Sequence, residues 1–157
     1  DYYANDWGKP ELAKAQAKNW YDNGVYAIFS AAGGTGNGTI AQAKEYRSQG
    51  KNVWAIGVDS DQYAEGVYAD GKSAVLTSMV KRVDLAVKQV ATEAKEGNFP
   101  GGEIVEFGLD ADGVDIAPTT DNLSEDMIKS VDEYKEKIKN GEIKVPETDK
   151  ELEEVLK

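Results

Sequence analysis

The glycine-rich stretch at residues 33–38 is the feature that most constrains this chain. It follows the apolar run of residues 25–30 and precedes a helical pattern that begins near Ile40. Glycine is favoured where the backbone takes a positive φ or must approach another group closely. A buried strand that leads through such a loop into a helix places backbone N–H groups and the positive end of the helix dipole at the carboxyl edge of a sheet. We therefore expect a small ligand at this edge; a tight turn without a ligand is the alternative.

This loop matches neither of the two common phosphate-binding motifs. Gly33 and Gly38 have the spacing of a P-loop, but Thr39 stands where that motif requires lysine, so no side chain is placed to reach the outer phosphates. The dinucleotide fingerprint would use Gly34 and Gly36, and its third glycine would fall at Thr39. The loop therefore gives little support to a nucleoside triphosphate or a dinucleotide as the ligand.

The composition excludes several classes of function. With 29 acidic and 18 basic side chains, the 157 residues carry a formal charge of -11, and such a surface repels nucleic acid and anionic membranes. The chain has no Cys and no His, which removes thiol nucleophiles, Ser-His triads and most transition-metal sites. No pair of carboxylates is singled out for acid and base chemistry, so the residues give no positive sign of catalysis, and no cofactor is expected.

The first half of the chain alternates between strand and helix patterns with short connections. Strands are predicted at residues 2–5, 25–30, 52–58 and 74–77, helices from Pro10 to Gly24 and over residues 40–49, and a surface loop at residues 63–73. This alternation is typical of α/β proteins and predicts a parallel sheet with helices on both faces.

The second half of the chain has stronger helix signals. Ser78 is expected to cap a long helix that ends at Gly97, and further strands are predicted at residues 104–109 and 114–117. Two more helices are predicted, one capped by Ser124 and ending at Gly141, the other opened by a capping box of Thr148 and Glu151.

Four side chains are candidates for contact with the ligand. Asp59 directly follows an apolar strand, and its carboxylate can accept two hydrogen bonds from vicinal sugar hydroxyls; capping of the turn is its alternative role, as it is for Asp61. Lys81 is expected in the first turn of the long helix, where the dipole disfavours a cation unless solvent or a partner compensates. Trp7 could stack on a flat ring or pack over the nearby helix, whereas Phe29 fits the core better than a ligand contact.

Five motifs resemble, in order along the chain, the basic membrane protein family: Tyr3-Ala4-Asn5-Asp6-Trp7, Ala31-Ala32-Gly33-Gly34-Thr35-Gly36-Asn37-Gly38, Ile56-Gly57-Val58-Asp59-Ser60-Asp61-Gln62, Leu76-Thr77-Ser78-Met79-Val80-Lys81-Arg82-Val83-Asp84 and Gly113-Val114-Asp115-Ile116-Ala117. Members of this family are substrate-binding lipoproteins of ABC transporters and include the purine nucleoside receptor. The resemblance covers most of the chain.

The resemblance implies a type I periplasmic-binding fold of two lobes, with a nucleoside, here expected to be a purine nucleoside, held in the cleft between them and no catalysis. It implies that Asp59 and Lys81 bind the ribose and that Gly33 and Gly34 line the cleft. It also implies that Trp7 or Phe29 supplies an aromatic contact to the base. The full-length form would be an extracytoplasmic, membrane-anchored lipoprotein that delivers its ligand to a transporter permease.

Family members are considerably longer, and the amino-terminal half of their pattern is missing here. We expect residues 1–77 to form the core of the carboxyl lobe, residues 78–121 to be a return helix and strands that pack on the missing lobe, and residues 122–157 to form C-terminal helices. Apolar surface left uncovered in this way favours the missing lobe, a second chain or a domain-swapped dimer as partner. Two other hypotheses stay open: an enzyme on a doubly wound sheet that acts on a nucleotide or sugar phosphate, and a stable fragment that binds no small molecule alone.

Overall fold

A single four-stranded sheet, in the order β1-β2-β5-β6, organises the computed structural model, which describes all residues 1–157. The strands β1 (Ala27–Phe29), β2 (Trp54–Asp59) and β5 (Val75–Lys81) are parallel, and β6 (Val114–Ile116) pairs antiparallel with the end of β5. The parallel sheet expected from the sequence is confirmed, with one antiparallel strand added at its edge. Because the three parallel strands share a direction, their carboxyl ends lie at the same edge of the sheet.

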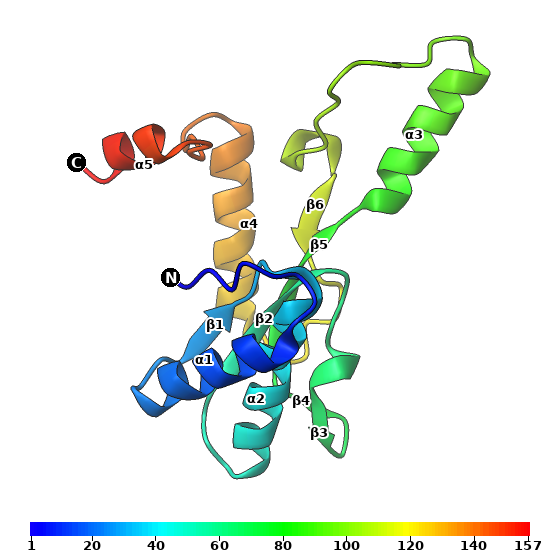
Figure 1. The fold of residues 1–157 in the computed structure, drawn as a ribbon. Coiled ribbons are helices and arrows are strands. Elements are labelled where there is room, and N and C mark those ends of the chain that lie inside the picture. Colours follow the sequence, from blue (N-terminus) through cyan, green and yellow to red (C-terminus); the bar gives the residue numbers. More distant parts are fainter.

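Two helices cover one face of this sheet, and the buried core lies beneath them (Figure 1). They are α1 (Pro10–Asp22) and α2 (Asn37–Ser48), which pack against each other. Ala17 and Ala43 lie in the contact between the helices and the sheet and are almost fully buried. The close approach of α1 and α2 requires glycine at position 38, since a Cβ there would lie 1.8 Å from the carbonyl oxygen of Pro10.

The helix α3 (Val83–Lys95) extends away from the sheet and contains no buried residue (Figure 1). We call residues 82–113 the arm; it comprises α3 and the chain that returns to β6. The arm is closed at its base by a hydrogen bond from Arg82 N to Gly113 O of 2.8 Å. Its exposed apolar side chains are Val83, Val87, Phe99, Ile104 and Val105.

The carboxyl-terminal helices begin at the residues expected from the sequence. The Ser124 hydroxyl accepts a hydrogen bond from Met127 N at the start of α4 (Glu125–Lys139), and Thr148 Oγ1 accepts one from Glu151 N at the start of α5 (Asp149–Val155). The ion pair of Lys135 Nζ with Asp115 Oδ1, at 2.8 Å, connects α4 to β6.

The prediction that Ser78 caps a helix is wrong. Ser78 lies inside β5, where it pairs with Gly57 of β2 and is fully buried, and α3 begins only at Val83. Lys81 is accordingly the last residue of β5 and does not occupy the first turn of a helix. Pairing with β2 between Val75 and Val80, and with β6 between Met79 and Lys81, keeps this segment extended, so tertiary structure overrides a local capping signal.

The predicted strands at residues 2–5 and 104–109 are also wrong. Neither segment pairs with another strand; Asn5 takes a φ of 53°, and Leu109 opens a short 3₁₀ turn, Leu109–Ala111. The strand predicted at residues 114–117 is present as β6 and pairs with β5.

The segment predicted as a surface loop at residues 63–73 contains a small hairpin. The strands β3 (Val67–Ala69) and β4 (Lys72–Ser73) are antiparallel, and a 3₁₀ turn, Ala64–Gly66, precedes them. The turn residues Asp70 and Gly71 have φ values of 44° and 77°, as a two-residue hairpin turn of type I′ requires.

Candidate ligand-binding site

Asp59 and Lys81 form an ion pair at the carboxyl edge of the sheet. Lys81 Nζ lies 2.9 Å from Asp59 Oδ1, and both side chains are about half exposed. Asp59 is the last residue of β2 and has a φ of 70°, a left-handed conformation that is uncommon for residues other than glycine, asparagine and aspartate. The pair presents one carboxylate and one ammonium group to solvent, so it offers both acceptors and donors to a polar ligand.

The turn after Asp59 is held by Gln62, a residue that the sequence reasoning missed. Gln62 Oε1 accepts a hydrogen bond from Val58 N at 3.0 Å, and Gln62 Nε2 donates one to Asn37 Oδ1 at 3.1 Å. Its backbone N–H donates to Ser78 Oγ at 3.1 Å. The glycine in the middle of β2 is the sequence signal for this arrangement, because a Cβ at Gly57 would lie 2.7 Å from Gln62 Oε1.

Asp61 caps this turn, as the sequence suggested. Its carboxylate accepts hydrogen bonds from Tyr63 N at 3.1 Å and, across the molecule, from Thr119 N at 3.2 Å. Asp61 is therefore occupied by backbone groups, whereas Asp59 is free of them.

The glycine loop forms a 3₁₀ turn, Gly33–Gly36, that leads directly into α2. Its Thr35 is fully buried and fastens the segment around Trp7 to the loop. Thr35 N donates to Trp7 O at 2.9 Å, while Thr35 Oγ1 donates to Asp6 O at 2.7 Å and accepts from Lys9 N at 2.9 Å. Thr35 is an inconspicuous residue among four glycines and is not among the residues expected from the sequence.

Gly33 and Gly34 lie directly against Trp7. A Cβ at Gly33 would lie 3.4 Å from Trp7 Cε3, and a Cβ at Gly34 would lie 3.1 Å from Trp7 O. Gly33 also takes a positive φ of 52°. The absence of side chains on the loop thus allows the tryptophan to approach it closely.

Trp7 and Phe29 are both exposed and both line a cavity of about 690 Å³ beside β1. Phe29 was expected in the core from its strand position; it is exposed instead, because no element packs over it. Most of the other lining residues come from the amino-terminal segment and α1, namely Asp1, Tyr2, Tyr3, Ala4, Asn5, Asp6, Ala13, Gln16 and Trp20. Asp59, Lys81, Gly33 and Gly34 do not line it.

The six candidate residues therefore form three groups at the same end of the sheet. One is the ion pair, one is the glycine loop with Trp7, and one is the cavity that Trp7 shares with Phe29. Trp7 joins the last two, and the hydrogen bond between Gln62 and Asn37 joins the turn after Asp59 to the helix that follows the loop.

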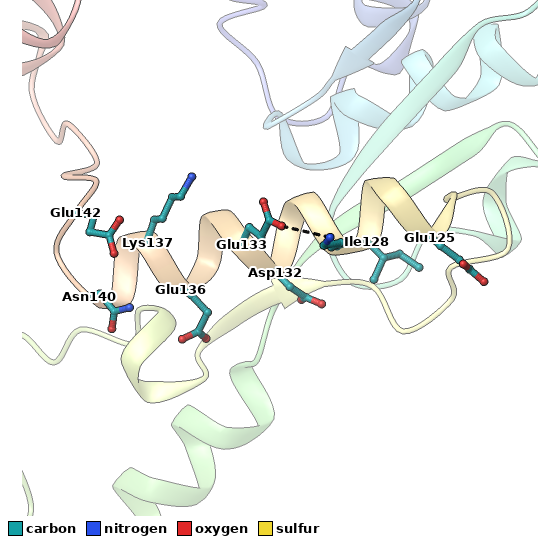
Figure 2. A pocket seen from close by; sticks show the side chains of 9 residues that line it. Glu125, Ile128, Asp132, Glu133, Glu136, Lys137, Asn140 and Glu142 are labelled. Atoms are coloured by element: carbon teal, nitrogen blue, oxygen red, sulfur yellow. Dashed lines mark ion pairs between the residues drawn. The ribbon is translucent and has the colours of Figure 1, made fainter.

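A second hollow, of about 630 Å³, lies on α4 and differs in character (Figure 2). Ile128 is its only hydrophobic lining residue, and the others are charged or polar, including Glu125, Asp132, Glu133 and Glu136. None of the six candidate residues contributes to it. No group of three or more carboxylates is arranged to hold a metal ion, here or elsewhere in the structure.

Comparison with known proteins gives the class of protein. The sequence model of a family described as ABC transporter substrate-binding protein, PnrA-like, matches residues 2–149. The chain therefore belongs to this family, the Bmp family. Such proteins bind substrates for transport and are not enzymes, which removes the support for an enzyme on a doubly wound sheet.

Three curated relatives illustrate the similarity. The chain is 50% identical over 151 residues to the CD4+ T-cell-stimulating antigen of Listeria monocytogenes. It is 37% identical over 151 residues to the ABC transporter nucleoside-binding protein BmpA of Lactococcus lactis, and 31% identical over 156 residues to basic membrane protein A of Borreliella burgdorferi. The matches cover 92%, 92% and 99% of this chain but only 42%, 42% and 44% of the relatives, so the chain spans less than half of their length.

Solved structures agree on the fold. A solute-binding protein of an ABC transporter system from Aeropyrum pernix matches with a TM-score of 0.74 and 25% identity, over 96% of this chain and 49% of that one. A transcriptional activator of the comK gene from Bacillus halodurans has the same fold, with a TM-score of 0.71, 21% identity and coverage of 86% of this chain and 44% of that chain. The architecture is that of one lobe of a periplasmic-binding-protein fold. None of the helices is both long and apolar enough to cross a membrane.

Proposed function

We propose that this chain forms most of the carboxyl-terminal lobe of a receptor that binds a nucleoside, with a purine base preferred, for an ABC transporter. The observation that carries the proposal is the ion pair of Asp59 and Lys81 at the carboxyl edge of the sheet. The Lactococcus lactis relative is named as a nucleoside-binding protein, which supports the ligand class.

The ion pair suits the ribose part of a nucleoside. Vicinal hydroxyls donate to the two oxygens of one carboxylate, and an ammonium group donates to a hydroxyl oxygen. Lys81 already lies at hydrogen-bond distance from Asp59, so the carboxylate is held in place before a sugar arrives. Both side chains are half exposed, which leaves them accessible to the ligand.

The base would lie nearer the glycine loop. Trp7 is exposed and is fastened to the loop through Thr35, and Phe29 shares a cavity with it. Either ring can stack on a purine, whose flat surface matches an aromatic side chain. Gly33 and Gly34, which lie against Trp7, would line the cleft between the lobes on this side.

A second lobe would complete the site. The chain spans 42% of the length of its Listeria relative, and the arm exposes apolar side chains that nothing in this chain covers. We propose the division made from the sequence: a lobe core at residues 1–77, a connecting part at residues 78–121 that packs on the second lobe, and C-terminal helices at residues 122–157. A second chain, as in a domain-swapped dimer, is the alternative partner for the arm.

The proposed cellular setting follows from the family. The full-length protein would be an extracytoplasmic lipoprotein held at the membrane by its lipid and would pass its ligand to a transporter permease. The formal charge of -11 argues against nucleic acid as a partner.

Isothermal titration calorimetry on the full-length protein with adenosine, guanosine, free ribose and the free bases tests the proposal. We expect the nucleosides to bind more tightly than ribose or base alone, because the ion pair and the aromatic side chains contact different parts of one ligand. The proposal would be refuted if the nucleosides did not bind, or if they bound no more tightly than free ribose or the free bases. The same titrations with this chain alone, together with its mass in native mass spectrometry, separate a lobe that needs its partner from one that binds alone.

A further inference from the structure

The conformation of Asp59 requires support from its neighbours. A φ of 70° is less favourable than an extended backbone for a residue with a side chain, and such conformations persist where surrounding contacts hold them. The turn supplies one contact itself, a hydrogen bond from Ser60 N to Val58 O of 2.8 Å. Pairing with Val80 of β5 supplies a second contact. The Gln62 side chain supplies a third, because its Oε1 accepts from Val58 N, one residue before Asp59.

Gln62 also contacts the two other elements of the candidate site. Its backbone N–H donates to Ser78 of β5, three residues before Lys81. Its Nε2 donates to Asn37, the first residue of α2, which directly follows the glycine loop. One residue thus touches the strand that carries Asp59, the strand that carries Lys81 and the helix that follows Gly33–Gly36.

The packing around Gln62 leaves it little freedom. The side chain lies over Gly57, where a Cβ would come within 2.7 Å of Gln62 Oε1 and 2.6 Å of Ser78 Oγ. Ser78 is fully buried and is paired with Gly57 in the sheet. The space above the end of β2 therefore fits this amide only because position 57 has no side chain.

We propose that Gln62 is a positioning residue for the ligand: it holds Asp59 in the left-handed conformation that points its carboxylate toward Lys81, and it fixes this pair relative to the glycine loop. The proposal rests on the proposed nucleoside site. Gln62 acts through Asp59 and Asn37. Its amide is suited to this role because it accepts a hydrogen bond on one side and donates one on the other.

The first test is made on this chain and needs no ligand. In Q62L both side-chain hydrogen bonds are lost, and NMR backbone chemical shifts are expected to report that Asp59 leaves its left-handed conformation for part of the time. Q49L is the matched control, since Gln49 is exposed and makes no side-chain hydrogen bond. An Asp59 that stays left-handed in Q62L would overturn the proposal, whatever the ligand.

The second test is made on the full-length protein with adenosine. Q62L is expected to weaken binding about fivefold to tenfold, the range set by the loss of one or two hydrogen bonds, while Q49L binds as the unchanged protein does. Failure of the unchanged protein to bind any nucleoside would refute the proposed function alone. Binding by the unchanged protein together with equal affinity of Q62L would refute the role of Gln62 alone.

A double-substitution cycle tests whether Gln62 and Asn37 are coupled in their effect on ligand affinity. In N37D the new carboxylate still accepts from Gln62 Nε2. In Q62E one carboxylate oxygen still accepts from Val58 N, and the other accepts from the Asn37 amide after that amide has rotated. Each single change therefore leaves a donor facing an acceptor. The combination of the two places carboxylates face to face. We expect the loss of affinity in the double variant to exceed the product of the two single losses by about fivefold or more. If the loss of affinity in the double variant equalled the product of the two single losses, the turn would not be coupled to α2.

Discussion

Lys81 Nζ lies 2.9 Å from Asp59 Oδ1, although the two residues stand 22 positions apart and end different strands. The pairing follows from the register of the sheet, in which Asp59 lies opposite Val80 and Lys81 is the next residue. The parallel pairing of β2 and β5 therefore places the Asp59 carboxylate and the Lys81 ammonium group at one edge of the sheet, and no loop contributes to the pair.

Removal of the Asp59 carboxylate tests its role directly. In the full-length protein D59A is expected to weaken adenosine binding tenfold or more, since a hydrogen bond to a charged group contributes about 1.5 to 3 kcal/mol. D59N separates charge from conformation, because asparagine tolerates the left-handed backbone as aspartate does. Calorimetric affinities of D59N close to those of D59A would assign the effect to the charge; unchanged affinity in both would remove Asp59 from the site.

The contact between α1 and α2 gives a prediction about stability. In G38A the new methyl group would meet Pro10 O at 1.8 Å and Lys14 N at 2.7 Å, both backbone atoms, so the two helices must separate. We expect a loss of about 2 kcal/mol or more in the free energy of unfolding, measured by urea titration. G8A is the control, because a Cβ at Gly8 meets only Asp6 Oδ1 at 3.8 Å. Equal stability of G38A and G8A would contradict the described packing.

A cluster around Asp22 predicts how stability depends on pH. The hydrogen bond from Lys18 Nζ, at 2.6 Å, lowers the pKa of Asp22 well below its usual value of 3.8, and bonds from Tyr46 Oη at 2.8 Å and Lys51 Nζ at 3.2 Å lower it further. Because the folded pKa is depressed, the contribution of Asp22 to stability is fully present above the pKa of the unfolded chain. It is lost as the pH falls through the folded value.

We therefore expect D22N to have a lower melting temperature than the unchanged chain at pH 7, with a difference that narrows below about pH 4. Thermal unfolding followed by circular dichroism between pH 2 and pH 8 measures this. D121N is the control, since Asp121 is exposed and takes part in no ion pair or side-chain hydrogen bond. A difference that stays constant with pH would mean that the cluster does not stabilise the charged form.

The arm gives a prediction about dynamics. In this chain the amides of α3 are expected to exchange with solvent faster than those of α2, because α3 buries no residue whereas α2 lies on the core. In the full-length protein α3 should become protected if the proposed second lobe covers its apolar side chains. Hydrogen exchange measured by mass spectrometry on both proteins tests this, and equal exchange of α3 in both would refute the packing of the arm on that lobe. Concentration-dependent protection in this chain alone would instead favour a second copy as the partner.

The sequence predicted the parallel sheet and several helix ends because these depend on local signals. The Ser124 and Thr148 caps and the close of α1 at Gly24 are where those signals place them. The Asp70-Gly71 pair carried an equally local hairpin signal, which the sequence reasoning passed over.

The remaining errors and omissions arise from contacts between distant parts of the chain. Serine often caps helices, but Ser78 lies in β5 because it pairs with Gly57 of β2 there. Gln62 and Thr35 hold the candidate site through hydrogen bonds to residues 25 and 29 positions away, respectively. Gly57 signals that a group packs closely on β2, but the sequence does not show that this group is Gln62, nor which residues Gln62 and Thr35 contact.

The position of Lys81 has a mechanical consequence. It is the final residue of β5, and the next peptide, at Arg82, is fastened to Gly113 at the root of the arm. A rotation of the arm relative to the sheet would thus pivot beside the ammonium group itself. Lys81, which is proposed to bind the sugar, would then lie at the hinge between the two lobes.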